Sequence, residues 1–172
     1  MIQFIPYPAL TPDLLRTLNE CITVEFGHVP FVQQRSWATP DWVVLWEADG
    51  EVATFCNIVE REILVDGQRR KAAGINNVIT PAAHRGKGYA SQVLREANAF
   101  LFRKLQADMG LLLCADALVP FYERLGWYTV ECQLVYDQPA GQEEYDSNVM
   151  LLSPAHTNRQ APAHIDLQGL PW

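Results

Sequence analysis

The hydrophobic pattern in the first half of the chain predicts one helix followed by three antiparallel strands. The helix is expected to begin after Thr11, an N-cap residue followed by proline, and to end at Gly27. Its apolar stripe consists of Leu14, Leu15, Leu18, Ile22 and Phe26. Asp-Gly pairs at 49–50 and 66–67 separate three apolar runs, and this dipeptide fits the primed turns of hairpins. A short strand is also expected at Ile2–Pro6.

The second half of the chain predicts a strand, a turn and a long helix, and then more strands. Gly74–Thr80 suits a strand, and from Tyr89 to Leu105 apolar residues recur at helical spacing. The almost wholly apolar run Met109–Cys114 indicates a buried strand. The remaining elements are expected at 117–125 (a short helix), 127–136 (a strand) and 149–152 (a strand).

These elements define the expected fold class. From residue 42 to residue 80 strands follow one another without intervening helices, which is unlike a doubly wound nucleotide fold. We expect an α/β (α+β) fold with a mixed, mostly antiparallel sheet of about seven strands and about four helices. At 172 residues the chain suits a single domain, 1–172. Residues 153–172 form a polar, proline-rich tail, expected to dock because it ends in the large apolar side chain of Trp172.

Composition narrows the classes of partner. The net charge of −7 favours neither nucleic acid nor an anionic membrane, and is compatible with a cationic substrate. The four cysteines are widely spaced, with no histidine at metal-ligand spacing, so free thiols and no metal are expected. The N-terminus carries no long apolar run, which predicts a cytoplasmic protein. Whether the chain forms a homodimer is left open.

The turn between the Gly74–Thr80 strand and the long helix carries a candidate phosphate site. Gly86 and Gly88 let a ligand approach the backbone closely, and the first amides of the helix have no internal partners. Arg85 and Lys87 add positive charge. A Walker loop is excluded because Gly88 follows the lysine, and a dinucleotide fingerprint because Ser91 replaces its third glycine.

Arg85-x-x-Gly88-x-Ala90 resembles the [QR]-x-x-G-x-[GA] signature of the GNAT superfamily of acyl-CoA-dependent N-acetyltransferases. The resemblance implies that acetyl-CoA is the cosubstrate and that its pyrophosphate is held by the turn and the helix start. The residues concerned are Arg85, Gly86, Lys87, Gly88, Tyr89, Ala90 and Ser91. It also implies that the preceding strand, through Val78, Ile79 and Thr80, pairs with the pantetheine arm, and that His28–Pro40 forms part of the acceptor wall.

A second match lies downstream. Tyr122-Glu-x-x-Gly126-Trp127 resembles the Y-E-x-x-G-[FW] segment of GNAT enzymes. The resemblance implies that Tyr122 is the general acid that protonates the departing thiolate. The alternative is a tyrosine that anchors a short helix in the core, since Phe121 and Leu125 flank it.

The general base and the acceptor site are less defined. Many GNAT enzymes have a carboxylate on the fourth strand, where this chain has Asn76 and Asn77, and an asparagine cannot take a proton. The segments 46–50 and 61–67, Ala82 and the late Asp146-x-x-Val149 stretch are similar in spacing to aminoglycoside 2'-N-acetyltransferases. This closer resemblance implies that Asp146 and the C-terminal carboxylate of Trp172 bind the acceptor, and we add Asn76 to that group. His28 and His84 are alternative bases or ordinary surface histidines.

Between Tyr136 and Ser153 lies an acidic cluster, formed by Asp137, Glu143, Glu144 and Asp146. The cluster either attracts a polyamine or aminosugar or is a solvated loop. The sequence therefore predicts direct acetyl transfer from acetyl-CoA to a small-molecule amine, with no cysteine in an evident nucleophile setting. A non-catalytic acyl-CoA- or metabolite-binding module and a protein N-acetyltransferase are the alternatives.

Overall fold

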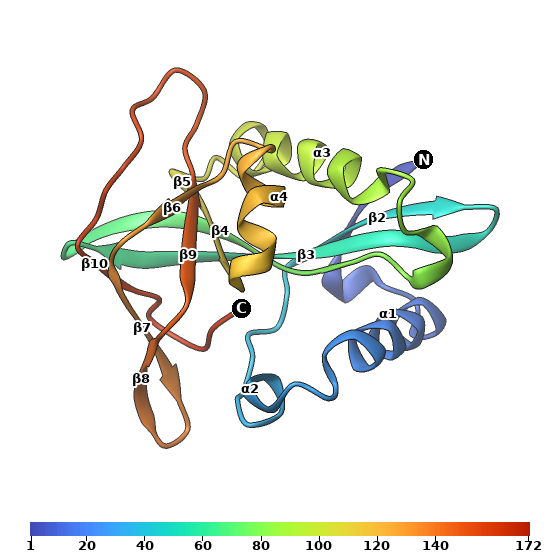
Figure 1. The fold of residues 1–172 in the computed structure, drawn as a ribbon, viewed down its shortest axis with the longest axis horizontal. Coiled ribbons are helices and arrows are strands. Elements are labelled where there is room, and N and C mark those ends of the chain that lie inside the picture. The colour runs from blue at the N-terminus through green and yellow to red at the C-terminus, as the bar shows by residue number, and fades with distance from the viewer.

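The computed structural model describes residues 1–172, which form a ten-stranded sheet with helices against both faces (Figure 1). The helices are α1 (Pro12–Phe26), α2 (Pro30–Gln33), α3 (Tyr89–Arg103) and α4 (Val119–Glu123). The first five strands are β1 (Ile2–Pro6), β2 (Trp42–Ala48), β3 (Glu51–Val65), β4 (Gln68–Ile79) and β5 (Met109–Cys114). The others are β6 (Tyr128–Val130), β7 (Gln133–Gln138), β8 (Gly141–Tyr145), β9 (Asn148–Leu152) and β10 (His164–Asp166).

The sheet is mixed and mostly antiparallel. Its strand order is β6-β9-β5-β4-β3-β10-β7-β8, and β2 pairs with β3 and β1 beside this path. Only β4 with β5 and β10 with β7 run parallel. The expected fold class is confirmed, although three more strands are present than the sequence predicts. The segment 127–136 divides into β6 and β7, β8 lies within the acidic cluster, and β10 lies in the tail.

The local signals of the first half of the chain are confirmed. The Thr11 hydroxyl accepts a hydrogen bond from the Leu14 amide at 3.3 Å, and α1 then continues to Phe26. Both residues of each Asp-Gly turn have positive φ, for example 54° at Asp49 and 80° at Gly50, as a primed hairpin turn requires. β2, β3 and β4 therefore form the predicted meander.

Helices cover the sheet on opposite sides (Figure 1). The apolar stripe of α3, which includes Val93, Leu94 and Leu101, packs with β3, β4 and α4 residues in the largest buried cluster. On the other side Leu18 of α1 packs against β2, β3 and the end of β4. No helix has the length and apolar character needed to cross a membrane.

The C-terminal tail packs against the sheet. β10 pairs antiparallel with β3 and parallel with β7, and Trp172 is 2% exposed. The Arg61 guanidinium donates to the carbonyls of Leu167 at 3.1 Å and Leu170 at 2.7 Å. The last residues of the chain, including Gly169 and Trp172, are thereby placed against the middle of β3 and β4.

Candidate active site

A β-bulge distorts β4 halfway along the sheet. Asn57 of β3 lies opposite Asn76, whereas Phe55 lies opposite Ile79, so β4 carries one extra residue between these pairs. Asn77 within the bulge has φ 48°, a left-handed conformation that asparagine tolerates better than most residues. The left-handed conformation gives Asn77 a structural reason to be asparagine. The bulge also changes the direction of β4.

Beyond the start of the bulge, β4 and β5 separate. Their parallel pairing covers only Ala72, Ala73 and Gly74, the last opposite Leu111. Residues 75–79 of β4 therefore have no strand on their β5 side, and one backbone edge is left without a ladder partner. An unpaired strand edge can bind an extended ligand through its backbone amides and carbonyls.

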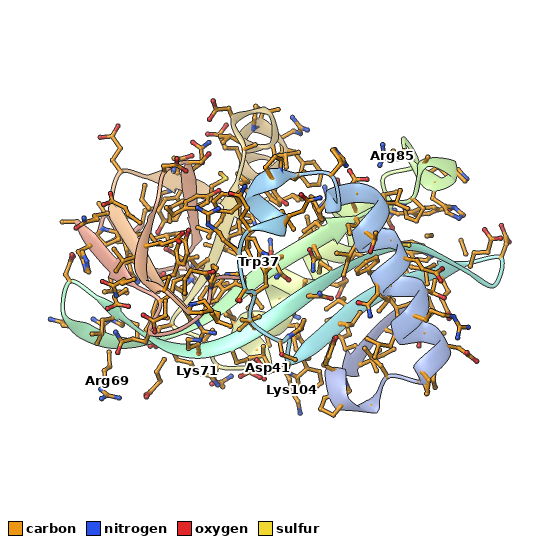
Figure 2. The ribbon with its side chains drawn as sticks, turned by 90° about the horizontal axis from the view of Figure 1, so that it is seen from below. Trp37, Asp41, Arg69, Lys71, Arg85 and Lys104 are labelled. Carbon is orange, nitrogen blue, oxygen red and sulfur yellow. The ribbon has the colours of Figure 1, made fainter.

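A cavity of about 580 Å³ lies where the two strands diverge. Residues 75–78 of β4 and 113–115 from the end of β5 line it, together with α1, the segment around α2, and α4. Figure 2 shows α1 and α2 in front of the sheet on this side, with Trp37 beside α2. Of its 25 lining residues 19 are hydrophobic, and none is Asp, Glu, Lys, Arg or His.

Tyr122 of α4 lines this cavity and is 6% exposed. Its ring contacts Phe121 and Trp127 edge-on, with centroids 5.1 and 6.5 Å apart, which fixes its orientation. Its hydroxyl makes no hydrogen bond within the chain, unlike that of Tyr128, which lies 2.8 Å from the Ser153 hydroxyl. Burial, with Cys114 and Cys56 nearby, raises the pKa of Tyr122, so the phenol keeps its proton at neutral pH.

Asparagine side chains supply much of the cavity's polarity. Asn19, Asn57, Asn76 and Asn77 all line it. The side-chain oxygen of Asn76 is buried and has no hydrogen-bond partner in the chain. A buried carbonyl oxygen without a donor is costly, so this atom is available to accept an N–H or O–H group from a ligand.

Cys114 also lines the cavity, which the sequence did not indicate. Its thiol lies 3.6 Å from the Met150 sulfur, and burial, followed by the nearby charge of Asp116, raises its pKa to about 11. A thiol that remains protonated near neutral pH is a poor nucleophile. The arrangement therefore favours direct transfer over an acyl-cysteine intermediate.

The predicted phosphate turn follows β4 after a short 3-10 helix, Ala82–His84. Gly86 and Gly88 have φ 75° and 78°, and a Cβ built on either would meet no atom within 4 Å, so the turn is open. The amides of residues 86–91 donate to no acceptor in the chain, because α3 begins at Tyr89 and its first internal acceptor, the Gly88 carbonyl, is used by Gln92. Six consecutive free amides at a helix start suit a phosphate group.

Arg85, which was predicted to bind the pyrophosphate, is engaged by groups of the chain itself. Its guanidinium lies 2.7 Å from the Glu25 carboxylate of α1 and donates to the Thr80 carbonyl at 2.9 Å. In Figure 2 the Arg85 label lies at the glycine turn, near one end of α1. Arg85 therefore braces the turn against α1, and Lys87, which is exposed and unpaired, is the free cation there.

The other residues predicted to bind the cosubstrate or the acceptor lie in several different places. Val78 and Trp172 line the cavity, whereas Ile79 packs on the α1 side and the Thr80 hydroxyl lies 2.9 Å from that of Thr54. Tyr89 packs against Trp46, with ring centroids 4.9 Å apart. Ala90 and Ser91 are half-buried in the first turn of α3.

The acidic cluster does not contribute to the cavity. Asp146 is exposed and lines no part of it, so the structure does not bring this predicted acceptor residue to the site. Glu143 lies 3.1 Å from Arg35, a partner outside the acidic segment, and Glu144 accepts from Gln133 across the β7–β8 pair. β8 turns the segment into a hairpin strand rather than an open loop.

Neither histidine alternative reaches the cavity. His28 is exposed, and His84 lies 3.5 Å from Glu51 with its Nδ1 buried and unpartnered. No three His, Cys, Asp and Glu side chains are grouped to hold a metal ion.

Several cavity residues were not predicted individually. They are mainly aromatic residues from separate segments, namely Tyr7, Phe26, Phe31, Trp37 and Tyr145. The sequence signal was weak, because large apolar residues near a helix end are as common in a core as in a binding site. Asn57 gave a better signal, since it interrupts the otherwise buried apolar run of β3.

Comparison with known proteins agrees with this geometry. A family model described as an acetyltransferase (GNAT) domain matches residues 10–130. A protein of Yarrowia lipolytica named lysine acetyltransferase is 29% identical over 138 residues, covering 66% of this chain and 34% of that protein. The chain thus spans about a third of the length of this curated relative.

Solved structures share the fold at low sequence identity. Escherichia coli ElaA has a TM-score of 0.64 and 17% identity, covering 89% of this chain and 99% of its own. Escherichia coli YhbS, a GNAT family N-acetyltransferase solved with CoA, has a TM-score of 0.63 and 14% identity, covering 99% and 94%. A GNAT acetyltransferase of Brucella melitensis, solved with acetyl-CoA, has a TM-score of 0.58 and 15% identity, covering 96% and 94%.

Proposed function

We propose that this chain, which belongs to the GNAT family of acetyltransferases, transfers an acetyl group from acetyl-CoA directly to a primary amine of a small molecule. The observation that carries the proposal is the continuity of three features along β4. These are the cavity beside Tyr122, the unpaired edge of residues 75–79, and the six free amides of the glycine turn.

Each feature corresponds to one part of the cosubstrate. The amides of residues 86–91 would bind the pyrophosphate, with Lys87 adding positive charge. The β4 edge would pair with the extended pantetheine arm, which then delivers the thioester to the cavity. Two family members are known in structures with CoA and acetyl-CoA, which supports this assignment.

The chemistry follows from the groups in the cavity. The neutral amine attacks the thioester carbonyl, a C–N bond forms, and the C–S bond breaks. The Tyr122 hydroxyl, protonated and free of other partners, donates a proton to the leaving thiolate. The amine loses its extra proton after attack, when it is strongly acidic, so water can accept it although no Asp or Glu side chain lines the cavity.

A protein or peptide lysine is the second candidate acceptor. The relative named lysine acetyltransferase, which aligns over 66% of this chain, supports a lysine side chain as the acceptor, whether in free lysine or in a peptide. An aminoglycoside-like or polyamine acceptor, predicted from Asp146 and the acidic cluster, receives less support because those carboxylates lie outside the cavity. All three acceptors share the same donor machinery.

The test is a thiol-release assay with acetyl-CoA and a panel containing aromatic amines, spermidine, kanamycin and a lysine-containing peptide. We expect amine-dependent release of CoA well above the hydrolysis rate. Tight acetyl-CoA binding in calorimetry with no amine-dependent release would instead establish a binding module and refute the transferase. Preferential release with the peptide would select the protein acceptor.

A further inference from the structure

Asn57 of β3 is the most deeply buried of the asparagines that line the cavity. It is 3% exposed, and only Thr54 and His84 are buried polar residues besides it. The Thr54 hydroxyl is satisfied within the chain, because it donates to the Ile79 carbonyl at 2.9 Å. The Asn57 carboxamide makes no hydrogen bond within the chain, and its polar atoms are not sealed from solvent. They therefore face the cavity that Asn57 lines and are free to bind a ligand.

Asn57 and Asn76 form a cross-strand pair. They lie directly opposite each other on the antiparallel strands β3 and β4, where the bulge begins. Such partners point to the same face of a sheet, with Cβ atoms about 4.5–5.5 Å apart. Both residues line the cavity, and the side-chain oxygen of Asn76 is also without a hydrogen-bond partner. This face of the sheet therefore presents two adjacent carboxamides that the chain itself does not use.

The spacing of the pair suits the nitrogen of a primary amine. An uncharged primary amine has two N–H groups and one lone pair, and each carboxamide oxygen can accept an N–H group. Two N–H groups on one nitrogen, each about 3 Å from its acceptor, place the two acceptor oxygens about 5 Å apart. The side chains of a cross-strand pair have about this separation. A secondary amine has only one N–H group and can engage only one of the two oxygens.

The pair also lies beside the expected position of the thioester. Asn76 belongs to the segment 75–79 of β4, whose open edge would bind the pantetheine arm, and Tyr122 lines the same cavity. A nitrogen held by Asn57 and Asn76 is therefore next to the strand edge along which the carbonyl carbon arrives. With both N–H groups held, the lone pair points away from the two oxygens and is free to attack. Fixing the orientation of a nucleophile in this way lowers the entropic cost of the transfer.

We propose that Asn57 and Asn76 hold the acceptor nitrogen through its two N–H groups and thereby select primary over secondary amines. The proposal rests on the proposed acetyl transfer and assigns residues to its acceptor site. It adds no chemical step, because neither carboxamide gains or loses a proton. It also gives a reason for the asparagine that interrupts the buried apolar run of β3, since an unpartnered buried carboxamide costs stability.

n-Butylamine and N-methylbutylamine test the proposal because they differ only in whether the nitrogen carries a second N–H group or a methyl group. Both have basicities near that of the lysine side chain, so the uncharged fractions are similar. With the full chain and acetyl-CoA, we expect thiol release to give a kcat/KM for n-butylamine at least about tenfold above that for N-methylbutylamine. Equal values, or a preference for the secondary amine, would overturn the proposal and leave acetyl transfer intact.

Asn57→Leu and Asn76→Leu separate hydrogen bonding from space, because leucine is branched and no smaller than asparagine but has no acceptor oxygen. In either variant one carboxamide remains for both amines, so the ratio of kcat/KM should fall at least about fivefold. The KM for acetyl-CoA should stay unchanged. The double variant should lower kcat/KM for both amines without a further fall in the ratio. Asn158→Leu, at an exposed position outside the cavity, is the control and should keep the wild-type ratio. A wild-type ratio in both single variants would contradict the proposal.

Stability provides a readout independent of turnover. Asn57→Leu replaces an unpartnered polar group beside an open cavity with an apolar one. Its thermal unfolding midpoint should therefore equal or exceed that of the wild type. A lower midpoint combined with a wild-type amine ratio would give Asn57 a structural role and refute the proposed one.

Binding is measured with 2,2,2-trifluoroethylamine and its N-methyl derivative, because their fluorines lower the basicity and both are uncharged at about pH 8. Fluorine NMR of the CoA-bound protein should show the primary amine bound at least about fivefold more tightly, and this difference should disappear in the double variant. Such selective binding without thiol release from any amine would support the site while refuting the transferase. Equal binding of the two amines, or binding of neither, would overturn the proposal.

Discussion

The indole of Trp172 occupies the space that a side chain on residue 74 would need. A Cβ built on Gly74 would lie 2.0 Å from both Cε2 and Nε1 of that ring, and the same Nε1 donates to the Leu111 carbonyl at 3.3 Å. Gly74 and Leu111 form the last residue pair of the parallel ladder between β4 and β5. The ring therefore packs where the strands begin to diverge, and it forms part of the cavity wall.

Gly74→Ala should destabilise the protein by about 3 kcal/mol or more, because the ring is held by buried neighbours and cannot move away without strain. Urea unfolding measures the loss. In a Trp172→Ala background the same substitution should cost less than about 1 kcal/mol, since the obstructing ring is absent. An equal cost in both backgrounds would show that the backbone, not the tryptophan, sets the requirement for glycine.

Tyr122→Phe should lower kcat about 10²-fold or more, because the variant lacks the general acid. Stability should stay nearly unchanged, because the Tyr122 hydroxyl makes no hydrogen bond within the chain. Steady-state thiol release and thermal unfolding measure the two effects. Tyr128→Phe is the control, since it removes hydrogen bonds to Ser153 and Gln160 away from the cavity and should affect stability alone. Wild-type kcat in Tyr122→Phe would eliminate the general-acid role.

Gly88→Ala should weaken acetyl-CoA binding at least about tenfold, because φ 78° strains alanine and the free amides around it would shift. Calorimetry gives the dissociation constant. Gly67→Ala is matched for strain, with φ 76° and open space, but lies in the turn at the opposite end of β4. It should cost similar stability and leave binding unchanged, and an equal loss of affinity in both variants would argue against a specific role for the glycine turn.

Stability should fall at alkaline pH because buried thiols and phenols must ionise on unfolding. Burial raises the pKa of Cys56 from 9.0 to about 12, so the folded state keeps a proton that the unfolded chain loses in this range. The stabilisation is complete below about pH 9 and is lost as the pH rises toward 12.

Urea unfolding at about pH 8 and pH 11 measures this loss. The drop should be smaller in Cys56→Ala than in the wild type by about 2 kcal/mol, because the variant lacks the strongly shifted thiol. Cys21→Ala is the control, since Cys21 is only partly buried and should contribute less. Identical pH dependence in wild type and Cys56→Ala would show that other groups control alkaline stability.

Signals that act within a few residues could be interpreted from the sequence alone. The N-cap and proline that start α1, the two Asp-Gly turns and the paired glycines before α3 each depend on backbone preferences of adjacent residues. They predicted the meander, the long helix and the turn whose amides are free. Tyr122 was identifiable for the same reason, since the motif that carries it is a contiguous segment.

Features that depend on distant partners were decided only by the tertiary structure. β8 and β10 are short and largely polar, and they become strands because β7 and β3 offer hydrogen-bonding edges. Asp146 and Trp172 looked equally promising in the sequence, yet chain packing leaves the first in solvent and inserts the second beside Gly74. The largely apolar lining of the cavity is likewise a property of segments that meet only on folding, because burial selects which side chains face inward.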